Sequence, residues 1–219
     1  MKTLVIYAHP NIPEESHASF TLKEMKAALD KAKIESEVID LYAINYDPVL
    51  KIDEHYASGK TSVSPQNREF QDKIKSSDAL VFIYPVWWAD TPAILKGFLD
   101  RVFTSGFAFS YKEGGLLKGK KSAVMISAGG DDKLPGKLMK EYILEWCGIE
   151  TKVFQLLNAR HLDDERKAEI QANVKKAVRF LKKKEETAPQ AQAPVQPAQP
   201  SQQAPAPQPA PQPQNPPTA

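Results

Sequence analysis

The chain has 219 residues, with 29 Lys or Arg against 27 Asp or Glu, so its formal net charge at pH 7 is only +2. Such a balance excludes the strongly basic character typical of proteins that bind nucleic acid or a membrane surface. The single cysteine excludes an intramolecular disulfide and is typical of a reducing compartment. No apolar run is long enough to span a bilayer, so we expect a cytoplasmic protein without membrane insertion.

The composition changes sharply near Glu186. Residues 187–219 carry no charged side chain and hold 11 of the 18 prolines, interleaved with Gln and Ala. A segment of this kind has almost nothing to bury, so we predict a disordered, polyproline-like tail. Residues 1–186 are then left as one folded domain of ordinary size. A proline-rich tail can also bind a protein partner.

The first part of the chain alternates apolar runs with helical patterns. Residues 4–8 form a continuous apolar run, which is typical of a strand buried on both faces. Apolar residues then recur at helical spacing from Ala18 to Ala32, and a short second strand is expected at 38–41. The polar segment 42–64 is too long for a tight turn, so we expect a functional or variable loop.

The rest of the domain continues this alternation. Thr91 and Pro92 are a typical N-cap and first helical residue. Strands are expected at 79–84, 122–127 and 152–157, and helices near 66–75, 92–102, 135–146 and 170–181. Five strands that alternate with helices predict right-handed crossovers and a parallel sheet with helices on both faces. This is the flavodoxin-like α/β fold, with strand order 2-1-3-4-5.

In a sheet of this order, ligands bind beyond the carboxyl ends of the strands, beside the point where the strand order reverses. The loop after the first strand contains four candidate cofactor-binding residues: His9, Ser16, His17 and Ala18. Free N–H groups and the dipole at the start of a helix favour an anion such as phosphate. The alternative is plain N-capping by Ser16, with Glu14 and Glu15 supporting the helix dipole.

The loop after the third strand contains two adjacent tryptophans between prolines. The candidate cofactor-binding residues here are Pro85, Val86, Trp87 and Trp88. Flat aromatic surface suits a planar heterocycle. We also expect the backbone N–H groups from Val86 to Ala89 to be free to reach the edge of a ligand. The alternative is a structural role for both tryptophans.

The loop after the fourth strand contains Ser127, Gly129 and Gly130. Paired glycines allow positive φ and close approach of the backbone to a ligand, although a simple turn is equally consistent. The three loops together imply an anionic group at one end of a ligand and a planar ring at the other, which fits FMN or FAD. The four histidines show no metal-ligand spacing, so no metal site is expected.

Several segments resemble the NAD(P)H quinone reductase family of flavodoxin-like flavoproteins, which includes azoreductases and modulators of drug activity. The resemblance covers roughly residues 1–160 and is most specific from Pro85 to Phe109. The residues that carry it are His9-Pro10-Asn11 with Ser16, Asp40-Leu41-Tyr42 with Asp47-Pro48, Tyr84 to Trp88, Thr91 to Phe103, and Gly106 to Tyr111.

The resemblance implies which part of the flavin each loop contacts. His9 and Ser16 match positions at the phosphate arm, and Pro85 to Trp88 match the loop that holds the isoalloxazine ring. The segment from Ser127 to Gly130 matches residues at the polar edge of the ring. One departure lies in the first loop, where Ala18 replaces an Asn that is frequent in the family.

The resemblance also implies a substrate pocket formed by Trp88, Phe109 and Tyr111. In family dimers the two aromatic residues near position 110 contribute to the pocket of the neighbouring subunit, so a homodimer is implied. A second departure concerns this pocket. Residues 131–136 replace a longer segment that usually carries Tyr and His beside the flavin.

We therefore predict a flavin-dependent enzyme that transfers two electrons from NAD(P)H to a quinone-like, azo or nitro acceptor. Because the flavin carries the chemistry, no catalytic side chain is expected. The alternative is a flavin-binding ancillary or electron-carrier subunit that docks on a partner such as a potassium efflux transporter, an interpretation that the tail supports. A third interpretation, which the short glycine loop allows, is that this chain is a family relative that no longer binds flavin.

Overall fold

The computed structural model describes residues 1–10, 15–55 and 62–183. The predicted domain boundary at 186 and the predicted tail over 187–219 lie outside these residues. Asn11 and Glu14, which belong to the predicted first ligand loop, also lie outside them.

Five parallel strands form the central sheet. They are β1 (Lys2–Tyr7), β2 (Glu35–Asp40), β3 (Ala79–Pro85), β6 (Lys121–Ser127) and β7 (Glu150–Leu156). Their order is β2-β1-β3-β6-β7, and each neighbouring pair is parallel. The labels differ from the predicted order only because β4 and β5 belong to a separate pair of short strands. The flavodoxin-like fold is confirmed.

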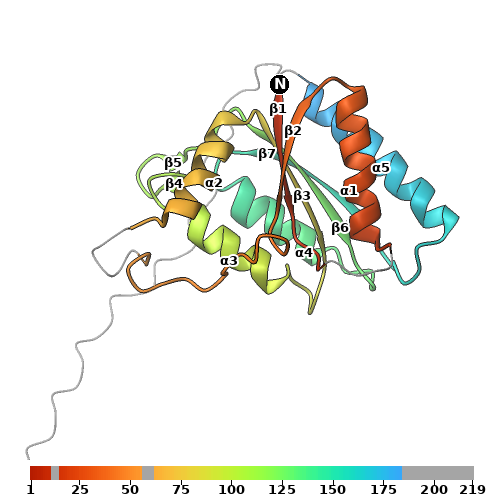
Figure 1. Ribbon diagram of the computed structural model, residues 1–219, viewed down its shortest axis with the longest axis horizontal. Coiled ribbons are helices and arrows are strands. Elements are labelled where there is room, and N and C mark those ends of the chain that lie inside the picture. The colour runs from red at the N-terminus through yellow and green to blue at the C-terminus, as the bar shows by residue number, and fades with distance from the viewer. Residues whose placement is uncertain (11–14, 56–61, 184–219) are drawn as a thin grey trace, which may run out of the picture. The chain divides into compact units, whose positions relative to one another are not determined.

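Helices cover both faces of the sheet (Figure 1). One face carries α1 (His17–Lys31) and α5 (Asp164–Lys182), and the other carries α2 (Pro65–Ser76), α3 (Ala93–Val102), α4 (Leu134–Lys137) and the π-helical segment η2 (Leu138–Leu144). Side chains alternate between the faces along a strand, so the buried strands supply two separate cores. In β3, for example, Ile83 packs with α1 and α5, while Phe82 packs with α2 and α3.

The helix predicted over 135–146 forms in two parts, α4 and η2. Gly136 allows α4 to approach the sheet closely. A Cβ at this position would lie 2.8 Å from the Cγ1 of Val153 and 2.9 Å from the side-chain amide of Gln155. The absence of a side chain at Gly136 thus lets the start of α4 lie against β7, close to the carboxyl edge of the sheet.

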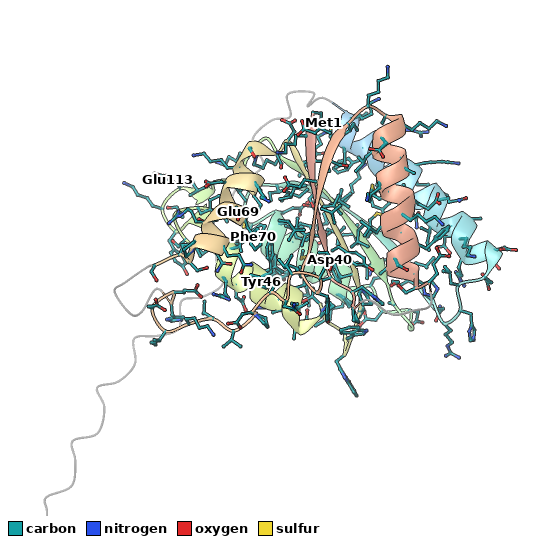
Figure 2. The ribbon with its side chains drawn as sticks, in the orientation of Figure 1. Met1, Asp40, Tyr46, Glu69, Phe70 and Glu113 are labelled. Atoms are coloured by element: carbon teal, nitrogen blue, oxygen red, sulfur yellow. The ribbon has the colours of Figure 1, made fainter. Side chains whose placement is uncertain are left out.

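The segment between β2 and α2 is anchored on α3. The Nε of Arg101 lies 2.7 Å from the Oε2 of Glu54, and the pair is almost fully buried. Tyr46 packs against Phe70 (Figure 2), with ring centroids 6.0 Å apart. It also packs against Phe98, with ring centroids 5.6 Å apart. These contacts fix the described part of the segment that the sequence predicted only as a long polar loop.

A short antiparallel pair, β4 (Phe109–Ser110) and β5 (Gly114–Gly115), was not predicted. Strands of two residues are too short to show an alternating hydrophobic pattern, so periodicity cannot reveal them. The pair lies beside α2 and α3, away from the central sheet (Figure 1).

Candidate cofactor-binding site

The three predicted ligand loops lie next to one another at the carboxyl edge of the sheet. The backbone N–H of Ala8 donates to the carbonyl of Ile83 at 3.0 Å, which joins the ends of β1 and β3. The N–H of Val86 donates to the carbonyl of Ser127 at 2.8 Å, which joins the ends of β3 and β6. Residues far apart in the sequence are therefore brought to one site.

Ser16 caps α1, as the structural interpretation of this loop expected. Its Oγ accepts from the N–H of Ser19 at 3.0 Å, and the Oγ of Ser19 accepts from the N–H of Ser16 at 2.7 Å. This reciprocal capping box leaves the N–H groups of His17 and Ala18 without a partner among the described residues. Capping and anion binding are thus compatible, because they use different N–H groups.

The acidic residue Glu15 does not occupy the start of the helix. Its carboxylate lies 3.6 Å from the Nζ of Lys23 and 4.0 Å from that of Lys167, and the first turn of α1 contains no acidic residue. Among the described residues, no carboxylate therefore competes with an anion for the positive end of the helix dipole. Beneath the loop, burial raises the pKa of Tyr7 to about 12, so its hydroxyl stays neutral near Ser16.

The two histidines of the first loop have partners in the backbone. The Nδ1 of the half-buried His9 lies 2.7 Å from the carbonyl oxygen of Pro10. The Nε2 of His17 lies 3.1 Å from the carbonyl oxygen of His161, in the loop after β7. His9 thus lies at the end of β1, and His17 joins α1 to a fourth loop.

The loop after β3 is a tight two-residue turn. The N–H of Trp87 donates to the carbonyl of Asp90 and the N–H of Asp90 donates to the carbonyl of Trp87, both at 3.0 Å. The expectation of four free N–H groups from Val86 to Ala89 was therefore wrong for two of them. Val86 and Trp87 donate within the protein, because a parallel strand end and a closed turn both require these bonds. The N–H groups of Trp88 and Ala89 have no partner in the part of the chain that the structure describes.

Both central residues of this turn have a left-handed backbone, with φ of 51° at Trp88 and 59° at Ala89. Such a conformation costs a residue other than glycine about 1–2 kcal/mol. The side chain of Trp88 is fully exposed and that of Trp87 is 41% exposed, so neither belongs to the core. The structural interpretation of the tryptophans therefore has no support here.

Thr91 does not cap α3, contrary to expectation. The helix begins at Ala93 with Pro92 as its N-cap, and no side chain caps it. Instead, the N–H of Thr91 donates to the Oδ1 of Asp90 at 2.6 Å. The Oγ1 of Thr91 is buried and has no hydrogen-bond partner among the described residues.

The glycine loop after β6 is open and unstrained. Neither Gly129 nor Gly130 has a positive φ, so the conformation that paired glycines allow is not adopted here. A Cβ at either position would meet nothing within 4 Å. The N–H groups of both glycines also lack a partner among the described residues. The absence of side chains thus leaves free space and two donors beside Ser127.

Sequence reasoning missed the loop after β7, which closes one side of the site. The N–H of Asn158 donates to the carbonyl of Gly130 at 2.9 Å, and the N–H of Ala159 donates to that of Ala128 at 2.8 Å. Asn158 has a φ of 52°. An asparagine just after the last strand was the available signal, because Asn tolerates the left-handed region better than most residues.

The structure does not bring Phe109 and Tyr111 to the carboxyl edge of the central sheet in the same subunit. They form an edge-to-face pair, with centroids 5.5 Å apart, and line a separate hollow of about 580 Å³. The hollow lies between α2, α3 and the β4–β5 pair, and none of the candidate cofactor-binding residues lines it. Of the three predicted substrate-pocket residues, only Trp88 lies at the cofactor edge.

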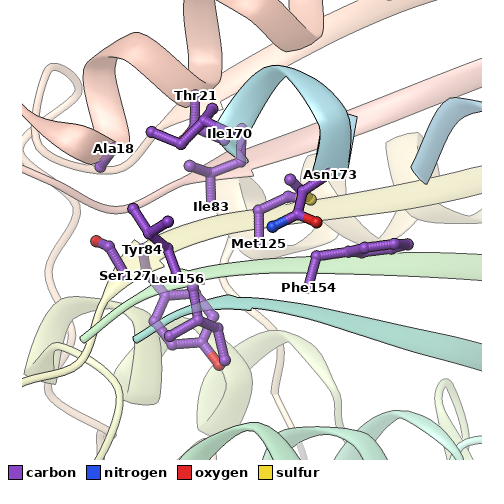
Figure 3. A pocket seen from close by; sticks show the side chains of 11 residues that line it. Ala18, Thr21, Ile83, Tyr84, Met125, Ser127, Phe154, Leu156, Ile170 and Asn173 are labelled. Atoms are coloured by element: carbon purple, nitrogen blue, oxygen red, sulfur yellow. The ribbon is translucent and has the colours of Figure 1, made fainter. Parts of the chain in front are cut away.

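A second, much smaller cavity of about 10 Å³ lies under α1 and α5 (Figure 3). It is too small for any ligand larger than one water molecule. Figure 3 also shows the ring of Tyr84 directed away from Ala18 and Thr21. The hydroxyl of Tyr84 is buried without a partner among the described residues, and burial together with the nearby charge of Asp90 raises its pKa.

No group of three or more potential metal ligands occurs within residues 1–10, 15–55 and 62–183. Over the same ranges, no helix combines the length and the apolar character that crossing a membrane requires.

The chain matches a family model described as a flavodoxin-like fold over residues 1–181. A curated relative from Haemophilus influenzae, an uncharacterized NAD(P)H oxidoreductase, is 32% identical over 203 residues, which cover 84% of this chain and 100% of the relative. NAD(P)H dehydrogenase (quinone) 1 of Cavia porcellus is 32% identical over 154 residues, which cover 61% of this chain and 55% of that protein. The chain thus spans about half the length of the Cavia relative.

Solved structures give the same result. Smu.1420 from Streptococcus mutans is 33% identical with a TM-score of 0.72, and the match covers 82% of this chain and 100% of that structure. An NAD(P)H:quinone oxidoreductase from Methanothermobacter marburgensis is 26% identical with a TM-score of 0.72, covering 85% and 99% respectively. The resemblance read from the sequence is confirmed.

Proposed function

This chain belongs to the family with the flavodoxin-like fold and is an oxidoreductase; on that premise we propose that it binds FMN or FAD at the carboxyl edge of its sheet. It then transfers two electrons from NAD(P)H to a quinone-like, azo or nitro acceptor. One observation carries the proposal. Six backbone N–H groups without a partner among the described residues lie on the three loops at this edge: those of His17, Ala18, Trp88, Ala89, Gly129 and Gly130.

The N–H groups divide into two kinds that fit the two ends of a flavin nucleotide. Those of His17 and Ala18 begin a helix of 15 residues, where the dipole favours a phosphate. We assign the phosphate arm to this end, together with His9 and Ser16. Of the two acidic residues that could compete for the dipole, Glu15 is paired with lysines, and Glu14 lies outside the described residues.

The other four N–H groups lie on the two loops where a planar ring would bind. Open space beside Gly129 and Gly130 lets a flat group approach the backbone, and exposed indole surface from Trp87 and Trp88 adds an apolar wall. We assign Pro85 to Trp88 and the segment from Ser127 to Gly130 to the isoalloxazine ring. These residues fit the polar edge and the flat faces of that ring.

When bound, the flavin supplies the chemistry by accepting a hydride from NAD(P)H and passing two electrons to the acceptor. The chain's own contribution is position and electrostatics. Backbone donors of Gly129 and Gly130 stabilise negative charge at the ring edge, because fixed N–H dipoles need no reorganisation. The protein needs no nucleophile for this reaction, and burial keeps Cys147 as a neutral thiol by raising its pKa to about 12.

We also propose that the protein is a homodimer in which Phe109 and Tyr111 complete the substrate pocket of the partner. The position of these two residues supports the proposal, because they line a hollow that none of the candidate cofactor-binding residues of the same subunit lines. Tyr111 is 72% exposed, so its ring is available to a second subunit. We further propose a cytoplasmic location, where NAD(P)H is present.

The proposal is tested by purifying the protein, adding FMN or FAD, and recording the visible absorbance of bound flavin. Steady-state oxidation of NADH and NADPH is then measured with benzoquinone as acceptor. Parallel reciprocal plots are expected, because donor and acceptor use the same aromatic slot in turn. A protein that gains no flavin absorbance with either nucleotide contradicts the proposal.

The second candidate is a flavin-binding ancillary or electron-carrier subunit that docks on a partner such as a potassium efflux transporter. The proline-rich composition of residues 187–219 favours it, since such segments bind proteins. The two candidates differ in turnover. Rapid reduction of free quinone by the flavin-loaded chain supports the enzyme, and bound flavin without turnover supports the subunit.

A further inference from the structure

The turn from Trp87 to Asp90 has a shape that its central residues do not favour. A two-residue loop with positive φ at both central positions is normally built from Asn-Gly or Asp-Gly. In this chain those positions are Trp88 and Ala89, with φ of 51° and 59°. The shape is therefore not produced by the central residues, and contacts on either side of them must hold it.

Asp90 makes those contacts. Its backbone forms both of the reciprocal hydrogen bonds with Trp87, each at 3.0 Å. Its Oδ1 accepts from the N–H of Thr91 at 2.6 Å, a short bond to an ionised acceptor. This bond ties the end of the turn to the residues that lead into α3, where no side chain provides a cap.

The flanking prolines make this contact more important. Pro85 and Pro92 have no N–H group, so neither can donate a backbone hydrogen bond that holds the loop from outside. The next residue in the loop, Thr91, has a buried hydroxyl without a partner among the described residues. The carboxylate of Asp90 is thus the side chain that fixes the junction between the turn and α3.

The shape of this turn determines which side chain and which N–H groups the loop presents to the site. Trp88 projects fully into solvent at the carboxyl edge, and the N–H groups of Trp88 and Ala89 are left open there. If the turn relaxed to negative φ at these two residues, the indole and both N–H groups would change direction. The presented groups therefore depend on a strained backbone.

We propose that Asp90 is a positioning residue, which holds the strained turn closed and so fixes the direction of Trp88 and of two open N–H groups at the ring end of the cofactor site. The part of this inference that concerns the cofactor rests on the proposed function. The role of Asp90 in the shape of the turn does not, and it can be measured without any ligand.

The first experiment measures amide hydrogen exchange by NMR in the full chain without added flavin. In Asp90→Ala, the N–H of Trp87 and of residue 90 should exchange about tenfold faster, because the turn opens more often. A tenfold change corresponds to about 1.4 kcal/mol. In Asp90→Ala combined with Ala89→Gly, exchange should return to within about threefold of wild type, because glycine adopts this backbone without strain.

The second experiment measures FMN binding by quenching of flavin fluorescence in the same variants. We expect about tenfold weaker binding for Asp90→Ala and recovery in the double variant. Asp132→Ala is the matched control. The Oδ1 of Asp132 accepts from the N–H of Leu134 at 2.8 Å in the neighbouring loop, so this variant loses a similar bond outside the turn.

The outcomes separate the alternatives. Unchanged exchange in Asp90→Ala overturns the inference. Exchange restored to the wild-type rate in the double variant without recovery of FMN binding also overturns it, because the side chain would then act on the ligand directly. If wild type binds no flavin, the proposed function fails, while the exchange data still decide whether Asp90 holds the turn.

Discussion

The two loops at the proposed ring end of the site present the same kind of group by opposite means. The turn after β3 opens two N–H groups with a strained backbone at Trp88 and Ala89. The loop after β6 opens two more with an unstrained backbone at Gly129 and Gly130, where the missing side chains leave space. Glycines in a candidate ligand loop can therefore provide space for a ligand rather than an unusual backbone conformation.

The largest expected effect comes from filling the space at the glycine loop. Gly130→Phe should weaken flavin binding about 100-fold, which corresponds to about 2.7 kcal/mol, because the ring would occupy the volume of the ligand. Thermal stability should stay within about 0.5 kcal/mol, since a Cβ at this position would meet no protein atom within 4 Å.

Lys133→Phe is the control for this prediction, because it adds the same ring to an exposed position of the same loop. It should leave flavin affinity unchanged. Equal losses in the two variants would mean that bulk anywhere in the loop interferes, and the comparison of the two loops would lose its basis.

The proposed phosphate end provides the next effect. Ser16→Ala removes the N-cap of α1 and should lower the free energy of unfolding by about 1 kcal/mol. Ser64→Ala removes the equivalent cap of α2, where the Oγ accepts from the N–H of Asn67. Denaturant unfolding should show similar losses for both, whereas only Ser16→Ala should weaken FMN binding. A loss of FMN affinity in Ser64→Ala would point to general loosening of the fold.

A smaller effect is expected from relieving strain in the turn. Ala89→Gly should raise the free energy of unfolding by up to about 1 kcal/mol, since glycine removes the left-handed penalty but adds unfolded-state entropy. Lys33→Gly is the control outside the site, with φ of 55° just after α1. Both should stabilise in urea unfolding. A destabilised Ala89→Gly would show that the turn is not strained.

The smallest effect is expected from the reverse substitution, glycine to alanine, in the loop after β6. Gly129→Ala should be neutral or raise stability by about 0.4–1 kcal/mol, because its φ suits any residue. Gly119→Ala, at a φ of 81°, should instead lower stability by about 1 kcal/mol. Thermal unfolding of the pair distinguishes a glycine kept for space from one kept for its backbone.

Much of the fold could be predicted because buried parallel strands and amphipathic helices leave strong patterns. The runs at 4–8 and 79–84 and the stripe from Ala18 to Ala32 carried those predictions. The pair of two-residue strands near Phe109 could not be predicted, because it contains no repeat. The anchoring of Glu54 on Arg101 joins residues 47 positions apart, a pairing that no local pattern encodes.

The site was predictable to the level of loops. Topology alone brings the ends of β1, β3 and β6 together, so Ser16, Trp87 and Gly129 could be assigned to one edge. Which N–H groups stay open could not be predicted. Val86 and Trp87 lost theirs to Ser127 and Asp90, and the choice depends on the register of neighbouring strands and the closure of one turn.

By itself the amino-acid sequence determined the alternating architecture, the order of the strands, the edge where the site lies and the family resemblance from Pro85 to Phe109. The alternation follows from hydrophobic periodicity, the strand order and the site edge follow from the usual topology of such sheets, and the resemblance follows from the residues themselves. Only the tertiary structure decided that Trp88 and Ala89 carry the strain while Gly129 and Gly130 do not. The value of φ at a loop residue is selected by the hydrogen bonds that close the loop, here those of Asp90. The residue types of the loop determine only which values of φ cost little free energy.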